Sequence, residues 1–156
     1  MTHSAQRAPN TILTVFKDRL SVAIIIPAAL RAVRHAVFIV EQHVPEDLEW
    51  DAMDVRSTHA LALAADGTAI GCGRLLPTGF IGRVAVLAPW RNRGIGAAVL
   101  VALVDLARDR GHARVTLNAQ VRAMPFYARH GFVATGEQFD EAGIDHRVMT
   151  RDLRAA

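Results

Sequence analysis

The residues whose types and spacing most clearly indicate chemistry lie in segment 84–97, which reads VAVLAPWRNRGIGA. An apolar stretch ends at a proline and is followed by a short basic turn and a long apolar segment with helical character. The first turn of a helix has backbone N–H groups without intrahelical partners and carries a partial positive charge. Gly94 and Gly96 leave those groups accessible, and Arg91 and Arg93 add positive charge beside them. The segment therefore predicts a site for a phosphate or pyrophosphate group.

Two better-known phosphate motifs do not fit this segment. No Lys-Ser or Lys-Thr pair follows the glycines, as a Walker A loop requires, and the third glycine of the dinucleotide fingerprint is missing. An alternative that needs no ligand is that Gly94 and Gly96 only allow a helix to pack closely on a sheet.

The residues around this turn predict a mixed α/β domain. Apolar periodicity and turn residues indicate helices at 28–41, 93–110 and 123–130, and strands at 20–26, 58–64, 68–76, 80–87, 113–119, 132–139 and 147–153. Segment 11–16 fits either a strand or an extended connection. Residues 140–145 are expected to form the loop between the last two strands.

Length and composition indicate one globular domain at 11–156, preceded by a disordered tail at 1–10. The chain has 156 residues, of which 51% are hydrophobic and 21% charged. The most apolar early run, 20–30, is too short to span a bilayer and contains Pro27. The first ten residues are polar and lack the apolar region of a signal peptide, so a cytoplasmic location without membrane contact is expected.

Charge and cysteine content exclude further classes. The net charge is +3, but no basic stripe alternates with aromatic residues, so nucleic-acid binding is not expected. The single cysteine, Cys72, lies in an apolar strand pattern and is expected to be a buried, inert thiol. No His, Cys or Asp cluster has the spacing of metal ligands, so no metal is expected.

The basic turn also resembles a known family. The order Arg91-x-x-Gly94-x-Gly96 after apolar residues 84–86 is similar to the acetyl-CoA signature of the GCN5-related N-acetyltransferases (GNAT). Phe126-Tyr127, just ahead of Gly-Phe, resembles the family's second hallmark, with Gln120 where many members have asparagine.

Within the family, the resemblance is greatest to a bacterial subgroup typified by the ElaA and YjcF proteins. The matching residues are Val37-Phe38-x-x-Glu41-Gln42-x-Val44-Pro45, Ala119-Gln120, Phe126-Tyr127 and Gly143-Ile144-x-His146. With the basic turn they cover roughly residues 33–149. The resemblance implies an α/β, single-domain GNAT-type fold, with a mixed, mostly antiparallel central sheet and flanking helices.

The resemblance implies that acetyl-CoA is the acyl donor. An amine of a small molecule or peptide would attack the thioester directly in a ternary complex. Backbone N–H groups of the strand would hold the pantetheine, and the one at Val86 would polarise the carbonyl. The implied cofactor-binding residues are Val84, Ala85, Val86, Arg91, Asn92, Arg93, Gly94, Ile95, Gly96, Ala97, Gln120 and Tyr127.

Three residues are candidates for proton transfer. In the family the residue matching Tyr127, the only tyrosine of the chain, can protonate the departing thiolate; alternatively, it packs its ring and hydrogen-bonds the cofactor without transferring a proton. The strand before this motif reads TLNA at 116–119 and has no carboxylate where the family often has its base. Glu41 and His146 are the substitutes, although each taken alone fits a structural role.

The acceptor is expected to be a cationic amine, because acidic residues accumulate in one segment without an intervening Lys or Arg: Glu41, Glu46, Asp47, Glu49, Asp51 and Asp54. By resemblance, this segment forms one wall of the acceptor cleft, and a negative wall attracts cations. The alternative is an acidic segment that is merely solvated.

A different class of function is an idle acyl-CoA-binding sensor or interaction module. A monomer or a homodimer would suit either.

Overall fold

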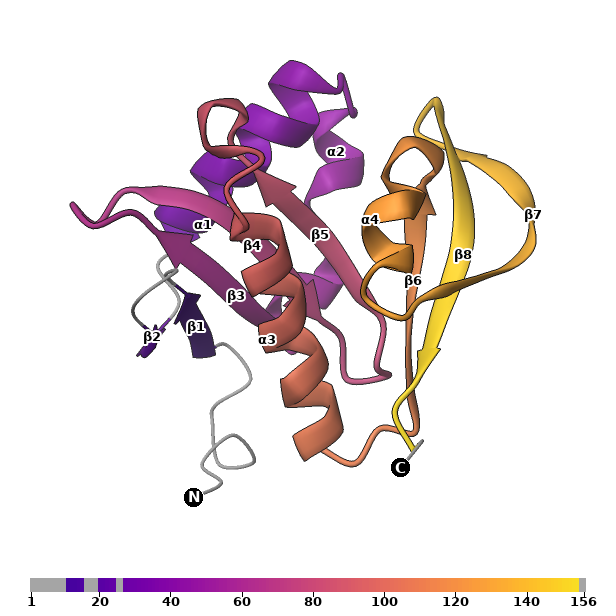
Figure 1. Ribbon diagram of the computed structural model, residues 1–156. Coiled ribbons are helices and arrows are strands. Elements are labelled where there is room, and N and C mark those ends of the chain that lie inside the picture. Colours follow the sequence, from indigo (N-terminus) through magenta and orange to yellow (C-terminus); the bar gives the residue numbers. More distant parts are fainter. Residues whose placement is uncertain (1–10, 16–19, 25–26, 155–156) are drawn as a thin grey trace.

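The computed structural model describes residues 11–15, 20–24 and 27–154, so the predicted tail at 1–10 lies outside the described residues. The elements follow one another along the chain as Figure 1 shows. They are β1 (Thr11–Val15), β2 (Leu20–Ile24), α1 (Pro27–Arg34), the π-helix η2 (His35–Glu41), α2 (Glu46–Glu49), η3 (Ala52–Arg56), β3 (Thr58–Leu63), β4 (Ala69–Leu75), β5 (Ile81–Val86), η4 (Ala88–Trp90), α3 (Ile95–Asp109), β6 (Arg114–Gln120), η5 (Val121–Ala123), α4 (Met124–Ala128), β7 (Val133–Glu141) and β8 (Ile144–Asp152).

The strands form two sheets that meet edge to edge (Figure 1). One has five strands in the order β2-β1-β3-β4-β5, and the other has three in the order β6-β8-β7. Pairing is antiparallel except between β1 and β3. The predicted mixed, mostly antiparallel sheet is thus confirmed, but it splits between β5 and β6, where Phe80 and Thr116 form an isolated parallel bridge. This split is where a ligand can enter between strands.

Helices cover both faces of the larger sheet. Successive side chains of a strand point to opposite faces, and on β3 Ala60 belongs to the core under α3 whereas Leu61 belongs to the core under α1. The α3 side is filled by fully buried residues such as Leu103. Burial on both faces explains why the residues of β3 from Ala60 to Leu63 are all apolar. No helix within the described ranges is long and apolar enough to cross a bilayer.

Two differences from the predicted elements affect the site. The predicted helix at 28–41 is present, but from His35 onward it is a π-helix, in which the Gln42 N–H donates to the Val37 carbonyl. The predicted loop at 140–145 is wrong: only Ala142 and Gly143, with φ of 53° and 79°, lie outside β7 and β8. Positive φ at both residues makes a two-residue turn whose twist suits the hairpin, so the strands extend further than predicted.

Of the segment at 11–16, for which a strand or an extended connection is expected, Thr11–Val15 form strand β1, and residue 16 lies outside the described residues. Strand β1 pairs with β2 on one side and lies parallel to β3 on the other. The N-terminal hairpin therefore extends the larger sheet at the edge opposite the split.

Candidate active site

Two cavities meet at the split between β5 and β6. One, of about 630 Å³, is lined by the basic turn and the start of α3. The other, of about 480 Å³, is lined by residues of η2, β5, β6 and the closing hairpin. Their shared residues are Gln42, Val84, Gln120, Ala123 and Tyr127. The molecule thus has a groove and a second chamber that share part of their lining, Tyr127 included.

The basic turn adopts the conformation that its glycines predict. Asn92 and Gly94 have φ of 64° and 80°, and α3 begins at Ile95. The first helical donor is Ala98, whose N–H bonds to the Gly94 carbonyl at 3.0 Å. The N–H groups of residues 95–97 therefore have no intrahelical acceptor and face the groove that these residues line.

The alternative explanation, that these glycines serve helix packing, is not supported. A Cβ atom at Gly94 would have nothing within 4 Å, and one at Gly96 would make only ordinary contacts, at 3.6 Å, with Phe126 and Val86. A Cβ at Gly73, in contrast, would lie 2.8 Å from Leu103 and 2.9 Å from Val99. Close packing of α3 therefore depends on glycines of β4, Gly73 and also Gly71, whose Cβ would lie 3.0 Å from Ile95, and the glycines of the turn leave room for a ligand.

The end of β5 presents polar backbone to the groove. The Leu87 N–H donates to the Ile70 carbonyl of the β4 side at 2.9 Å. Because N–H groups alternate in direction along an antiparallel strand, the N–H of Val86 points away from β4, toward the split. Val86 and Val84 both line the groove. The free backbone groups at this edge of β5 can therefore form hydrogen bonds with an extended ligand, as they would with a neighbouring strand.

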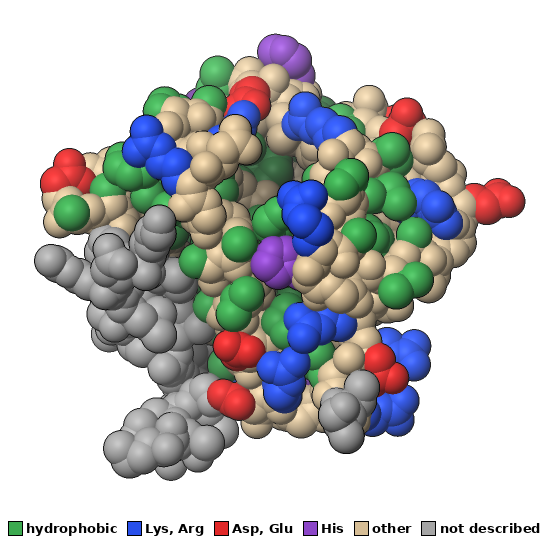
Figure 2. Space-filling model, in the orientation of Figure 1, with side chains coloured by type: hydrophobic (Ala, Val, Ile, Leu, Met, Phe, Trp, Pro, Cys, Tyr) green, Lys and Arg blue, Asp and Glu red, His purple; other side chains and the backbone are tan. Residues whose placement is uncertain are grey.

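The arginines that line the groove are only partly those predicted. Arg91 donates to the Val86 carbonyl at 2.9 Å and to both carboxylate oxygens of Glu41 at 2.7 Å. Arg93 lies over the Trp90 ring, 5.0 Å from its centroid. Arg122 and Arg129, which the sequence reasoning missed, line the groove together with Arg91. Figure 2 shows basic side chains around the hollow near the start of α3.

Glu41 is therefore poorly suited to be the base. Its hydrogen bonds with Arg91 lower its pKa, which makes it a weaker proton acceptor, and it lines neither cavity. Glu41 has a structural role instead: its ion pair with Arg91 connects the end of η2 to the basic turn. The expectation that Glu41 takes a proton from the substrate is corrected on this ground.

Tyr127 lies at the junction of the two cavities. Burial raises its pKa to about 12, so the phenol keeps its proton at neutral pH. Its ring makes edge-on contacts with Phe126 and Phe132, with centroids 5.1 and 5.9 Å away. Packing fixes the ring while the side chain borders both chambers.

His146 faces the smaller chamber beside Glu141, a residue that the sequence reasoning missed. The Nδ1 atom of His146 lies 2.7 Å from the Ile144 carbonyl, and Nε2 lies 3.7 Å from a Glu141 carboxylate oxygen. Glu141 also accepts a hydrogen bond from Asn118 at 3.2 Å, and His146 stacks on Phe139. The two-residue turn of the hairpin produces this pair, because it keeps Glu141 within β7 opposite β8.

Gln120 is held at the junction by both ends of its amide. It donates to the Gln42 side-chain oxygen at 2.9 Å and accepts from Arg122 at 2.9 Å. Gln42 directly follows η2, so this hydrogen bond connects the end of η2 to the end of β6. A pantetheine contact of Gln120 remains a prediction.

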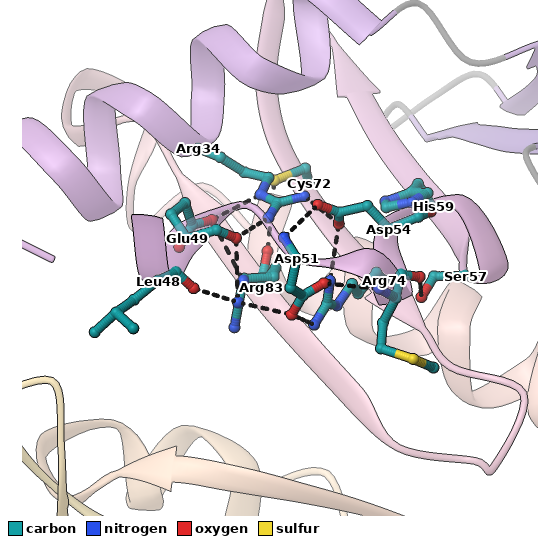
Figure 3. Close-up of polar contacts among 11 residues, drawn as sticks. Arg34, Leu48, Glu49, Asp51, Asp54, Ser57, His59, Cys72, Arg74 and Arg83 are labelled. Atoms are coloured by element: carbon teal, nitrogen blue, oxygen red, sulfur yellow. Dashed lines mark hydrogen bonds and ion pairs between the residues drawn. The ribbon is translucent and has the colours of Figure 1, made fainter. Parts of the chain in front are cut away.

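The acidic segment is not the uncompensated wall that the sequence predicted. Figure 3 shows its carboxylates facing arginines from α1, β4 and β5. Arg34 bonds to Glu49 and Asp54 at 2.7 and 2.6 Å, and Arg74 bonds to Asp51 and Asp54, each at 2.8 Å. With Glu41 paired to Arg91, only Glu46 and Asp47 of the predicted wall have no ion pair among the described residues. The electrostatic basis for a cationic acceptor is largely removed.

The pKa values of this cluster follow from burial and pairing. Hydrogen bonds and charge from Arg74 lower the pKa of Asp51 to about 2. Burial raises the pKa of Glu49, whose side chain is 2% exposed, against the opposing effect of Arg34. Within the described part of the chain, no group of His, Cys, Asp and Glu side chains is assembled as a metal site.

Comparison with known proteins identifies the class of protein that this arrangement defines. Residues 22–153 match the acetyltransferase (GNAT) domain family, and the chain belongs to that family. It is therefore an acyltransferase that uses an acyl-CoA co-substrate. The predicted family and enzyme class are confirmed.

Individual relatives support the predicted subgroup. The uncharacterized N-acetyltransferase YjcF of Bacillus subtilis is 36% identical over 124 residues, which cover 77% of this chain and 88% of YjcF. The crystal structure of Escherichia coli ElaA superimposes with a TM-score of 0.72 at 30% identity, covering 80% of this chain and 89% of ElaA. An acyl-CoA N-acyltransferase from Pseudomonas aeruginosa gives a TM-score of 0.72 at 33% identity, covering 80% and 88% of the two chains.

Proposed function

We propose that the protein transfers an acetyl group from acetyl-CoA to the primary amine of a small molecule or peptide, by direct attack within a ternary complex. The observation that carries this proposal is the junction of the two cavities at Tyr127. The groove with the basic turn suits the nucleotide and pantetheine of the donor. The chamber with His146 suits the acceptor amine.

Binding and orientation would be performed mainly by backbone. The free N–H groups at the start of α3 suit the pyrophosphate, with Arg122 and Arg129 beside them. The Val86 N–H suits the thioester carbonyl oxygen, on which negative charge develops during attack. Such a donor contributes about 2.7–4 kcal/mol where it has been removed by mutation, and holding two reactants together contributes roughly 7–11 kcal/mol.

Tyr127 would donate its proton to the departing sulfur. A phenol with a pKa of about 12 is a weaker acid than a thiol near ~8.5, so full transfer to a solvated thiolate would be uphill by roughly 5 kcal/mol. The sulfur departs, however, into the same water-poor junction that raises the phenol pKa. The proton therefore moves as charge builds on the sulfur, and the hydrogen bond lowers the barrier to bond breaking.

His146 would accept the proton of the amine. If the proton on Nδ1 is donated to the Ile144 carbonyl, the lone pair lies on Nε2, beside Glu141. Nε2 would take the proton of the ammonium group, directly or through a water, and the Glu141 carboxylate would stabilise the imidazolium that results. This assignment uses one of the two predicted candidates and adds Glu141 as its positioning residue.

The proposal is tested by thiol release from acetyl-CoA with a panel of primary amines. His146→Gln should lower kcat/KM about 100-fold or more, the range of a lost general base. His35→Gln is the matched control, because His35 is an exposed histidine of η2 that lines neither cavity. Binding of acetyl-CoA by calorimetry without thiol release for any amine would favour the idle acyl-CoA-binding module instead.

A further inference from the structure

The backbone of β5 is distorted at Arg83, whose side chain borders the smaller cavity. Arg83 has a φ of 53°, and the pairing of β4 with β5 shifts register between Cys72 and Arg74. A left-handed conformation is unfavourable for a non-glycine residue, because its Cβ lies too close to the following carbonyl oxygen. Such strain persists only where the surrounding structure fixes it, and it is concentrated at functional sites.

Arg83 is held more loosely than the other two arginines of the cluster. The ion pairs of Arg34 and Arg74 with the carboxylates measure 2.6–2.8 Å. Arg83 approaches Glu49 at 3.4 Å and Asp51 at 3.3 Å, and donates to the Leu48 and Glu49 carbonyls at 3.2 Å. Arg34 and Arg74 thus make the short bonds to the carboxylates of this cluster.

One end of the Arg83 guanidinium has no protein partner. Its contacts use Nη2 and Nε, and no described residue accepts a hydrogen bond from Nη1. In Figure 3 this nitrogen points away from the labelled carboxylates. Burial is the main cause that lowers the pKa of Arg83, and Glu49 opposes it only in part. Glu49 and Asp51 thus contact the guanidinium only through Nε and Nη2, and its other end faces no carboxylate of the cluster.

This free end borders the acceptor chamber. Arg83 lines the 480 Å³ cavity, and its side chain is 25% exposed. The remaining wall is mixed: one part is apolar, with Phe38, Val44, Leu48, Phe80 and Ile144, and the carboxylates of Glu49, Asp51 and Glu141 also line the cavity. Arg83 and Tyr127 line this same cavity, so a group bound at Arg83 shares one chamber with the junction where the amine is proposed to react.

We propose that Arg83 binds a carboxylate of the acceptor, so that the acceptor is an amino acid with an apolar side chain. This rests on the proposed amine acetylation. Guanidinium and carboxylate match in geometry and charge, and the apolar part of the wall suits the side chain. The carboxylate would complete the hydrogen bonding of Nη1, which the strained backbone presents to the chamber.

The first test compares leucine with 3-methylbutylamine, which is leucine without its carboxylate, by thiol release from acetyl-CoA. The ratio of their kcat/KM values should fall about 10- to 100-fold in Arg83→Gln, the range of a charged hydrogen bond. Taking the ratio between variants cancels the different basicity of the two amines. Arg108→Gln, an exposed arginine on α3, should leave the ratio unchanged.

The second test needs neither turnover nor a variant. Calorimetry on the native protein with coenzyme A compares N-acetyl-leucine with N-acetyl-3-methylbutylamine, and binding of the first should be at least 10-fold tighter. Equal affinity, or no binding of either, overturns the carboxylate site. Thiol release without carboxylate preference also overturns it and leaves the proposed function standing. Preferential binding of N-acetyl-leucine without thiol release from any amine supports the site and overturns the function.

Discussion

Replacing Arg34 by methionine should destabilise the protein more than the loss of any exposed charge. Arg34 is 1% exposed and gives three short bonds: Nε to the Glu49 carboxylate at 2.7 Å, Nη1 to Asp54 at 2.6 Å and Nη2 to the Glu49 carbonyl at 2.6 Å. Methionine fills part of the space but leaves Glu49, itself 2% exposed, without its closest cation.

The expected loss follows from the uncompensated charge. Removing one partner of a buried ion pair costs about 3–5 kcal/mol, because the other charge stays buried. In a chain of this length 1 kcal/mol corresponds to about 2–4 °C, so Tm should fall by roughly 6–20 °C.

Arg31→Met is the matched control, measured by urea unfolding alongside Arg34→Met. Arg31 is an exposed residue of the same helix, and both guanidinium groups lie over Trp50, at 4.6 and 4.7 Å from its ring centroid. The two variants therefore lose a similar cation–π contact and differ in the buried pair. The control should cost about 1 kcal/mol or less.

The pH dependence provides a second check on the same variant. Burial already raises the pKa of Glu49, and without Arg34 it should rise further. A raised carboxyl pKa means that the folded state takes up the proton more readily, so the deficit should shrink as the pH falls from 8 to 5. The reasoning about this network would be refuted if Arg34→Met lost no more free energy of unfolding than Arg31→Met, or if its loss became larger as the pH falls.

Three further predictions concern the site and a buried histidine. Gly94→Val should weaken acetyl-CoA binding more than 10-fold by calorimetry, because valine is strained at a φ of 80°, whereas unchanged affinity would place the cofactor elsewhere. Tyr127→Phe should lower kcat about 100- to 10,000-fold with little change in acetyl-CoA affinity, and equal turnover would leave the tyrosine a packing role. Burial lowers the pKa of His59, so the unfolded state binds more protons and native stability should decline as the pH falls below about 6.5. His59→Gln should lack this decline in urea titrations, and an identical pH profile would contradict it.

The basic turn and α3 could be predicted because their signals are local. One segment contains the turn residues Asn92 and Gly94, both with positive φ, and the long apolar stretch of α3. The site made of backbone N–H groups follows from the geometry of a helix N-terminus alone. In the neighbouring strands, apolar and polar residues alternate where one face is buried, and apolar residues follow one another where both faces are buried. Nothing distant in sequence is needed to form these features.

The charge network could not be predicted, because its partners come from separate elements. The sequence shows a run of carboxylates without basic neighbours, yet Arg34, Arg74 and Arg83 reach it from α1, β4 and β5 (Figure 3). Glu141 was missed for a local reason. A two-residue turn usually carries Asn-Gly or Asp-Gly, and Ala142-Gly143 gives a weaker signal, so a longer loop was predicted.

The end of η2 connects the two halves of the site. Glu41 and Gln42 are consecutive, and the first binds Arg91 of the basic turn while the second binds Gln120 at the junction. Since η2 continues α1, and α1 is fixed by Arg34 to the acidic segment, one continuous helical stretch positions the donor groove and the acceptor wall. The π-helical geometry at this stretch sets which side chains reach those partners, and irregular turns of this kind are frequent at functional sites. The arrangement explains why Glu41 serves as an anchor, and under the proposed function it leaves proton transfer to Tyr127 and His146 on the opposite side of the split.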